Sequence, residues 1–542
     1  MVSPISMQVD GSSRNVRPPM TSFSPSIWAD TFTNFKYDPL EQEKYGEAIE
    51  ALKKETRSKL LAAKSGELIK LTDIIVRLGL AYHFETEIKE KIETIYNDFN
   101  GARMQTMTCV FEKFKDEENK FKESVKNDVE GLLSLYEAAH IRVHGEDILE
   151  EAVAFTTHHL KLILSQGLIV ISPGLQDKVT RALDQPHCRG ARITEIRVYI
   201  STYENDIESR DESFLKLSKL NFNFLQNLYK KEICELTGWW NKFDLKSKLT
   251  YARDILVECY FWGVCFNFEP EYSYVRKMTA ISAQMATIMD DTYDNYGTLE
   301  ENQLFTDVLE RWDMNEIDIL PDYMKTVFQF VVSIYEDVER DAAEQGKSFA
   351  APYFKEAIQQ LGRAYNKEQI WTMERQMPPL EEYVTNSVIT SCIFVMLTSI
   401  LPGIKSATKQ TADWLMSWPQ ILISTAKLGR LLDDLASQEV PREREGKLLT
   451  VVDCYMKEHP GVSKQATLAK FREGVENRWK DIIHNMKEKA KWVDPGTNEM
   501  VELFLNYARN ASVTYKDSDG FSNPEKSWAP QIAATFVDPI VI

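Results

Sequence analysis

Glycine, proline and long apolar runs are all scarce in this sequence of 542 residues. The 22 glycines and 20 prolines fall mainly between helical runs, for example at Pro173-Gly174 and Pro402-Gly403. Strand-like alternation is hard to find, whereas apolar residues recur at helical spacing in stretches such as 68–75 and 144–152. We find no apolar run long enough to cross a bilayer. The sequence therefore predicts an all-α protein without membrane insertion.

Positive charge is also in short supply. The formal net charge is −18 and the isoelectric point is near 5.1, which disfavours nucleic acid and anionic membranes as partners. The charge does not exclude an anionic small molecule as a partner, provided that metal ions bridge it to the protein. The seven cysteines are scattered without metal-type spacing, as expected for reduced thiols in a cytosolic protein.

The first residues lack the apolar core of a signal peptide. Their serine content and low acidity are compatible with a transit peptide, but the piece before Arg17 is short for one. We therefore expect an uncleaved cytoplasmic protein whose residues 1–26 are disordered. The helical rhythm breaks near 235–248, which divides the remainder into an N-terminal helical domain, 27–238, and a C-terminal domain, 239–542. All the dense carboxylate motifs lie in the C-terminal domain, so we place the chemistry there.

Three carboxylates follow an apolar helical run. Apolar residues recur at helical spacing from Ile281 to Met289, which predicts a buried helix. Residues four apart share a helix face, so Asp290 and Asp294 point the same way, with Asp291 beside them. Carboxylates suit hard cations such as Mg²⁺, whose shell is usually completed by waters and substrate phosphates. Taken alone, the cluster is equally compatible with an acidic helix end in solvent.

A second apolar helix runs into paired aspartates at 430–440. Asp433 and Ser437 are four residues apart and share a face, and a serine hydroxyl can join a carboxylate on a magnesium ion. Alone, this cluster too reads as solvated surface. If the two helices meet in a bundle, their oxygen atoms would form a multi-metal clamp for a diphosphate.

With these motifs in view, the chain resembles plant class I terpene synthases, and most closely the cytosolic sesquiterpene cyclases of cadinene or germacrene type. The stretch 290–294 is similar to their aspartate-rich motif, and 433–437 to the start of their second metal box. Further similarities are Tyr251-Ala252-Arg253-Asp254, Tyr260-Phe261-Trp262, Phe268-Glu269-Pro270 and Asp517-Ser518-Asp519-Gly520-Phe521. The resemblance runs from about Phe23 to Ile542. No Asp-x-Asp-Asp box of the protonation-initiated cyclases is found.

The resemblance implies a C-terminal class I helical bundle beside an N-terminal helical, barrel-like domain. It implies three Mg²⁺ ions, with Mn²⁺ as a substitute, which help to ionise an isoprenoid diphosphate. Asp290, Asp294 and supporting Asp291 would hold one metal pair, and Asp433 and Ser437 the third ion. Diphosphate contacts are expected from Arg253, Asp290, Asp294, Arg430 and Asp433. Trp262 would line the apolar pocket, and Tyr515 and Asp519 would lie on a closing loop. The polar stretch 390–392 occupies the place of a helix kink, or its hydroxyls simply bond the helix backbone.

The sequence departs from the family pattern at three places. Pro441 stands where the second metal box usually has a glutamate, and because proline breaks helices, we expect the helix to end before it. Glu439, Glu443 or Glu445, or water, would replace that ligand, and Glu443 is the preferred substitute. Ile255 stands where the family often has a second arginine. The segment 100–108 looks shortened, which threatens stability more directly than chemistry.

The expected function is cyclisation of farnesyl diphosphate by a monomeric cytosolic enzyme. The alternatives are a synthase acting on geranyl diphosphate, a chain-elongating prenyltransferase, and a non-enzymatic helical protein or synthase relic impaired by Pro441, Ile255 and the shortened segment 100–108. The product is not specified by the sequence.

Overall fold

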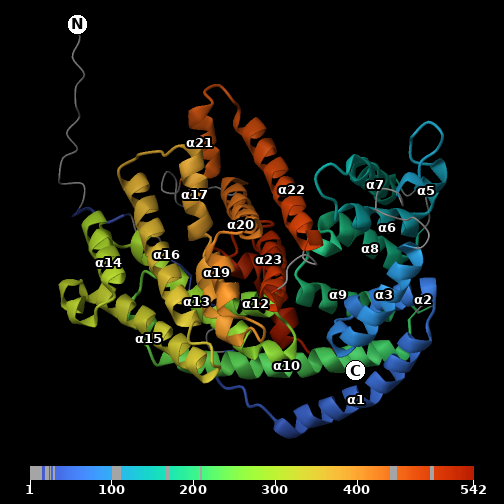
Figure 1. The fold of residues 1–542 in the computed structure, drawn as a ribbon, viewed down its shortest axis with the longest axis horizontal. Helices are drawn as coiled ribbons and strands as arrows, with labels where there is room; N and C mark the ends of the chain where they lie inside the picture. The colour runs from blue at the N-terminus through green and yellow to red at the C-terminus, as the bar shows by residue number, and fades with distance from the viewer. Residues whose placement is uncertain are drawn as a thin grey trace.

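The computed structural model describes residues 15–18, 23–24, 26–28, 31–100, 111–166, 171–207, 210–439, 449–488 and 494–542. Over these residues the chain is almost wholly helical (Figure 1). This part of the chain contains no β-strand, only one isolated bridge between Lys115 and Phe121. The prediction of an all-α fold with two helical domains is confirmed.

The N-terminal domain gathers the first helices of the chain on one side of the molecule (Figure 1). Polar N-caps set several starts: Asp38, Asp128 and Ser172 each accept a hydrogen bond from the first turn of the following helix. Its elements are α1 (Pro39–Ala62), α2 (Ser65–Arg77), η2 (Ala81–His83), α3 (Glu85–Asn100), α5 (Glu123–Asn127), α6 (Val129–Ala139), α7 (Asp147–Gln166), α8 (Pro173–Asp184), η3 (His187–Arg189) and α9 (Arg192–Asn205).

One long helix, α10 (Glu212–Asn241), runs beneath both domains (Figure 1). It packs on α1 and α9 of the N-terminal domain and also on α12 (Leu256–Phe266) and α13 (Ser273–Asp294) of the C-terminal domain. The boundary placed at 238/239 by the sequence therefore falls inside the last turn of α10. The tryptophan pair that interrupts the sequence pattern is still helical, because Trp240 is buried in the core that both domains share.

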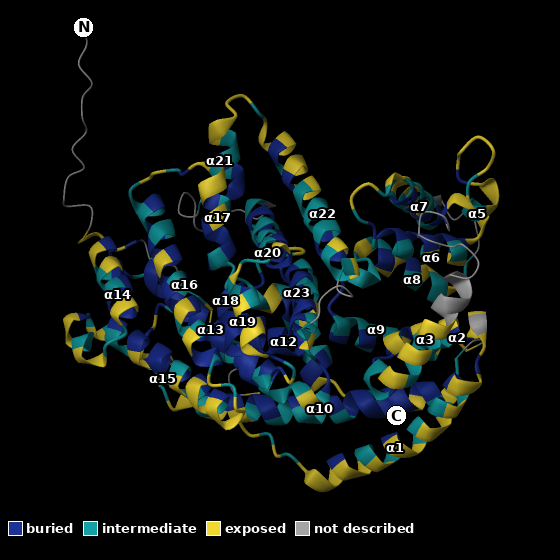
Figure 2. Cartoon of the chain, in the orientation of Figure 1, coloured by how far each residue is buried: buried dark blue, intermediate teal, exposed yellow. Residues whose placement is uncertain are grey.

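The C-terminal domain surrounds the α12–α13 pair with further helices. α12 is buried at every position, and Figure 2 colours the centre of this domain as buried and the outer faces of its surrounding helices as exposed. The remaining elements are α11 (Leu245–Lys248), η4 (Pro270–Tyr272), α14 (Leu299–Arg311), η5 (Met314–Ile319), α15 (Asp322–Glu344), α16 (Ala350–Met373), α17 (Leu380–Thr390), α18 (Ile393–Ser399), η6 (Leu401–Gly403), α19 (Lys409–Met416), α20 (Gln420–Glu439), α21 (Val451–Glu458), α22 (Lys464–Glu488), α23 (Pro495–Thr514), α24 (Pro524–Ser527), α25 (Ala529–Ile532) and η8 (Ala533–Val537).

The close approach of α12 to α13 depends on Gly263. A Cβ atom at this position would lie 2.3 Å from the backbone oxygen of Arg276, closer than any van der Waals contact allows. Glycine therefore brings the helix that carries Trp262 against the helix that carries Asp290.

Residues 15–18 of the N-terminal segment are among those that the structure describes, and the expectation of disorder for residues 1–26 stays a prediction. Residues 15–18 lie against the C-terminal domain, where Arg17 donates a 2.8 Å hydrogen bond from Nη1 to the backbone oxygen of Tyr296 and pairs with Glu301 at 3.1 Å. The Arg17 guanidinium also stacks over the Tyr296 ring, 4.4 Å from its centroid. Composition could not predict this contact, because a single arginine that packs against two distant tyrosines, Tyr296 and Tyr323, forms no recognisable sequence pattern.

The stretch Leu380–Gly403 corrects another reading of the sequence. By length and hydropathy it could cross a membrane, since it has 24 residues and its most apolar 18-residue window has a mean hydropathy of 1.8. In the structure it comprises α17, α18 and η6, and 72% of its most apolar window is buried inside the protein. It is a core element whose apolar character serves packing between helices.

Candidate active site

A cavity of about 240 Å³ opens among α13, α16, α20 and α23 in the C-terminal domain. Both predicted oxygen clusters border it, through Asp290, Asp294, Asp433 and Ser437. Five other predicted site residues also line it, namely Arg253, Trp262, Arg430, Tyr515 and Asp519, whereas the predicted ligand Asp291 is buried and does not. Two motifs more than 130 positions apart in sequence therefore meet at one cavity.

The first cluster lies in the last turn of α13. One oxygen from each of Asp290, Asp291 and Asp294 lies within 4.8 Å of the others, which is close enough for the group to share metal ions. Asp290 is 34% exposed, whereas Asp291 is completely buried. Such oxygen donors fit a hard divalent cation such as Mg²⁺.

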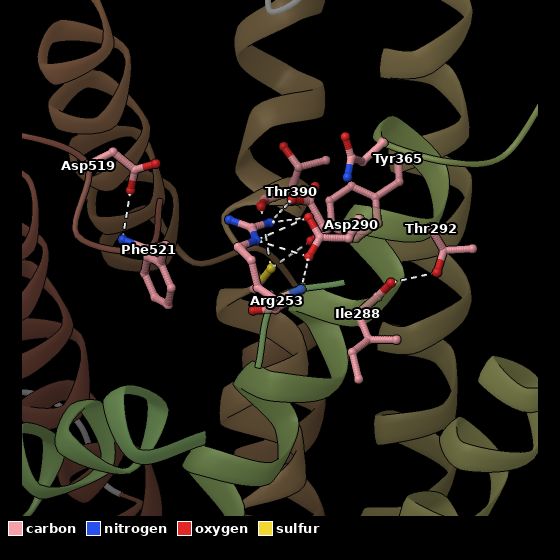
Figure 3. A network of polar contacts seen from close by, with 12 residues as sticks. Arg253, Ile288, Asp290, Thr292, Tyr365, Thr390, Asp519 and Phe521 are labelled. Atoms are coloured by element: carbon pink, nitrogen blue, oxygen red, sulfur yellow. Dashed lines mark hydrogen bonds and ion pairs between the residues drawn. The ribbon is translucent and has the colours of Figure 1, made fainter. Parts of the chain in front are cut away.

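Arg253 holds Asp291 from the segment that precedes α12 and also contacts Asp290 (Figure 3). The backbone nitrogen of Arg253 donates to Oδ2 of Asp291 at 2.8 Å, and the guanidinium Nε lies 3.0 Å from the same atom. The guanidinium Nη2 also donates to Oδ2 of Asp290 at 2.7 Å. Burial raises the pKa of Asp291, and the charge of Arg253 opposes that shift. Both oxygens of Asp291 accept from Arg253, so Asp291 orients the arginine; its supporting part in metal binding stays a prediction.

The second cluster repeats this arrangement on α20. Arg430 pairs with Asp433 and, through Nε at 3.0 Å, with Oδ1 of Asp434. Asp434 is buried and accepts from the Tyr383 hydroxyl at 2.9 Å and from the backbone nitrogen of Val451 at 2.8 Å. Asp433 keeps 20% of its side chain exposed and borders the cavity. Each cluster thus has one buried aspartate that orients an arginine and a more exposed aspartate that faces the cavity.

Pro441, Glu443 and Glu445 lie outside the described residues. α20 is described as far as Glu439, so the expectation that the helix ends before Pro441 stays a prediction. The choice of Glu443 as the substitute ligand stays a prediction.

Glu368 on α16 is a cavity residue that the sequence analysis missed. Its Oε1 accepts hydrogen bonds from the Thr390 hydroxyl at 2.8 Å and from Nδ2 of Asn386 at 3.2 Å. Burial raises the pKa of Glu368 to about 7, although the charge of Arg430 opposes the shift. A lone acid on a helix has no neighbour that marks it as functional, so no sequence signal distinguishes it.

Aromatic rings form the apolar wall of the cavity. The Trp262 ring lies 5.4 Å from Tyr507 in an edge-on arrangement and 5.5 Å from Phe521. Its Nε1 donates to the Thr514 hydroxyl at 3.1 Å, which fixes the ring in place. Tyr507 was not predicted, since it looks like an ordinary apolar position of α23.

The expected helix break at 390–392 is present between α17 and α18. Cys392 adopts a left-handed conformation with φ of 61°, which is unusual for a residue other than glycine. The Ser391 carbonyl, released from the helical pattern, accepts from the Tyr507 hydroxyl at 2.9 Å. The Ser391 hydroxyl bonds back to the carbonyl of Val388 at 2.7 Å, so both readings of this stretch apply.

Tyr515 and Asp519 both reach the cavity from the segment after α23. No hydrogen bond joins them in the described structure: Oδ1 of Asp519 instead accepts from the backbone nitrogen of Phe521 at 2.9 Å (Figure 3).

Ile255, the other departure from the family pattern, is buried in the core. Its backbone nitrogen donates to Oε1 of Gln284 at 3.0 Å, and the side chain does not line the cavity described above.

Comparisons with known proteins agree with this geometry. Residues 241–481 match the family described as "Terpene synthase family, metal binding domain", and residues 100–183 match "Terpene synthase, N-terminal domain". The chain is 49% identical over 550 residues to gamma-cadinene synthase of Ocimum basilicum, covering 98% of this chain and 99% of that protein. It is 48% identical to tau-cadinol synthase of Lavandula angustifolia, covering 97% and 98% of the two chains.

Solved structures give the same result for the fold. Isoprene synthase from grey poplar (Populus x canescens), in complex with three Mg²⁺ ions and dimethylallyl-S-thiolodiphosphate, superposes with a TM-score of 0.84 at 30% identity over 92% of this chain and 97% of that chain. Limonene synthase with 2-fluorolinalyl diphosphate gives 0.86 at 27% identity over 98% and 99%. Since near-half identity extends over almost the whole chain, this protein belongs to the terpene synthase family, as a lyase of sesquiterpene type that uses divalent metal ions.

Proposed function

We propose that this enzyme ionises farnesyl diphosphate and cyclises the resulting carbocation to a sesquiterpene, releasing diphosphate. The observation that carries the proposal is the meeting of two oxygen clusters at the mouth of one aromatic cavity. The relatives named for cadinene, cadinol and curcumene make fifteen-carbon skeletons, which supports farnesyl diphosphate as the substrate.

Asp290, Asp294, Asp433 and Ser437 would hold three Mg²⁺ ions, and Mn²⁺ would be a substitute. When bound, the ions supply Lewis-acid stabilisation of the departing diphosphate. Their carboxylate donors match the chemistry of hard cations. We propose Glu443 as a further ligand in place of the residue expected at position 441.

Arg253 and Arg430 would bind the diphosphate oxygens. Each guanidinium is anchored by a buried aspartate, so it reaches the cavity in a fixed orientation. A guanidinium suits phosphate because its planar fork donates two parallel hydrogen bonds. The anchoring reduces the conformational freedom that would be lost when substrate binds.

The aromatic wall protects the carbocation. Rings of Trp262, Tyr507 and Phe521 present π faces and edges rather than nucleophiles, and each cation–π contact contributes about 0.5–2 kcal/mol. Tyr515 and Asp519 would close the cavity from the segment after α23 and keep water from the cation. We further propose that the enzyme works as a cytoplasmic monomer.

The decisive experiment supplies farnesyl and geranyl diphosphates separately with Mg²⁺ and analyses the volatile products. The proposal predicts cyclic fifteen-carbon products from farnesyl diphosphate and their loss when the metal is chelated. Asp290→Asn should abolish turnover, whereas Asp322→Asn, at a fully exposed position of α15, should not. Turnover of geranyl diphosphate alone would replace this assignment by a ten-carbon synthase. Longer chains formed with added isopentenyl diphosphate would indicate a prenyltransferase, and failure to bind Mg²⁺–diphosphate an inactive relic.

A further inference from the structure

An ion-pair cluster joins the two domains on the side of the molecule where α22 approaches α6 and α8 (Figure 1). We define the Glu476 clamp as Arg142, Arg189 and Glu476. Arg189 donates from Nη1 to Oε1 of Glu476 at 2.5 Å and from Nη2 to Oε2 at 2.8 Å. Arg142 adds a third hydrogen bond, from Nη2 to Oε2 at 3.0 Å. One carboxylate of the C-terminal domain thus engages two arginines of the N-terminal domain.

The two arginines are well shielded from solvent. Their side chains are 6% and 10% exposed, whereas Glu476 keeps 38% of its side chain exposed. The Arg189 guanidinium also lies over the Trp479 ring, 5.1 Å from its centroid. Burial alone would raise the pKa of Glu476, but the hydrogen bond and charge of Arg189 and the charge of Arg142 outweigh it and lower the pKa to about 2. The clamp therefore stays ionised at every pH at which such an enzyme works.

The same helix that carries Glu476 packs along the second metal box. α22 lies against α20, and a Cβ built at Gly474 would contact Leu431, next to Arg430, at 3.4 Å. One turn further along α22, Asp481 accepts from the buried Ser424 hydroxyl of α20 at 3.2 Å. Asp481 also pairs with His144 of the N-terminal domain at 2.9 Å. A continuous set of contacts therefore runs from the N-terminal domain through α22 to α20.

The N-terminal domain also reaches the segment that follows α23. The backbone oxygen of Cys188, next to Arg189 in η3, accepts from Nε of Arg509 on α23 at 3.0 Å. Asp184 pairs with Lys516, which directly follows the cavity residue Tyr515. The segment 184–189 thus contacts two elements that pack around the cavity, namely α22, which lies against α20, and the end of α23 with the residues that follow it.

We propose that Glu476 is a positioning residue for the lyase reaction: through α22, the N-terminal domain holds α20 so that Asp433 and Ser437 face Asp290 across the cavity. The N-terminal domain then contributes no group to the chemistry but sets the separation of the two metal-binding clusters. This inference rests on the proposed function, because it assigns Glu476 a part in that site. It predicts that loosening the clamp weakens metal and diphosphate binding at groups that it does not touch.

The test compares Glu476→Gln with wild type and with Glu473→Gln, an exposed glutamate on the same helix. Two readouts are needed: the Mg²⁺ concentration for half-maximal turnover, and the dissociation constant of Mg²⁺–pyrophosphate measured by calorimetry without substrate. We expect both to rise about tenfold in Glu476→Gln, the lower end of effects seen for residues that support metal ligands. Glu473→Gln should match wild type. Arg189→Lys, which keeps the charge but loses the two-pronged contact, should give an intermediate rise.

A change in melting temperature alone would overturn the proposal. If Glu476→Gln unfolds at a lower temperature but keeps wild-type Mg²⁺ and pyrophosphate constants below that temperature, the clamp only stabilises the domain contact. Arg189→Lys decides the question by the same two constants if Glu476→Gln does not fold. Absence of pyrophosphate binding by the wild-type enzyme would instead count against the proposed function itself.

Discussion

Replacement of Asp291 by asparagine separates the orienting role of this residue from metal binding. The substitution keeps the shape of the side chain but removes the charge opposite Arg253, which is itself only 9% exposed. Breaking a buried ion pair typically costs about 3–5 kcal/mol. We expect about 3 kcal/mol, the lower end, because Arg253 keeps its contact with Asp290 and because burial already disfavours the ionised form of Asp291.

The loss is measurable as a shift in thermal unfolding. For domains of 150–250 residues a change of 1 kcal/mol moves the midpoint by about 2–4 °C, so we expect Asp291→Asn to unfold about 6–12 °C lower in metal-free buffer. Asp294→Asn is the matched control on the same helix turn: its midpoint should change little, while its Mg²⁺ requirement should rise steeply. Equal midpoints for wild type and Asp291→Asn, or an equal fall in both variants, would refute the division of roles between the two aspartates.

Three further predictions concern other parts of the chain. Burial raises the pKa of Glu258 to about 7, so the folded state holds a proton that the unfolded state loses near pH 4.5, and this group should lower stability by about 3 kcal/mol as pH rises from 4.5 to 7. Because Glu368 has a similarly raised pKa, urea unfolding of Glu258→Gln should show a smaller decline than wild type over this range, not a flat profile. Gly263→Ala should lower the free energy of unfolding by about 1–3 kcal/mol or more, because the added methyl group overpacks the contact between α12 and α13. Gly238→Ala, in open space on α10, should raise the free energy of unfolding by up to about 1 kcal/mol. Equal effects of the two substitutions would contradict the close approach of α12 and α13. Glu443→Ala should raise the Mg²⁺ concentration for half-maximal turnover, and an unchanged value would remove Glu443 from the proposed ligand set.

The sequence predicts the cavity-facing oxygen atoms well because short-range periodicity determines them. Asp290 and Asp294 share a face by helix geometry alone, as do Asp433 and Ser437. That the two pairs meet across one cavity depends on the packing of α13 and α20 in the bundle, and the sequence indicated it only through resemblance to a family. The partners of the buried aspartates could not be predicted. Nothing in the sequence around Asp291 or Asp434 indicates that an arginine side chain will pair with it.

Other features escape prediction because they depend on a single residue in three-dimensional context. Glu368 and Tyr507 look like ordinary helix positions, and only the packing of their helices brings them to the cavity. Arg17 contacts Tyr296, which is 279 positions away in the sequence. The sequence analysis also passed over 380–403 as a candidate span, although a buried core segment and a membrane span meet the same requirement for apolar residues.

The continuity of α10 has a practical consequence for dividing this protein. Of its residues, those from Phe214 to Trp240 that face inward are covered partly by the first half of the chain and partly by the second. A fragment beginning near residue 239 would lose this shared support and leave apolar surface of α12 and α13 uncovered. Chimaeras with related enzymes should therefore exchange segments ahead of Glu212, so that each hybrid inherits α10 together with the catalytic half.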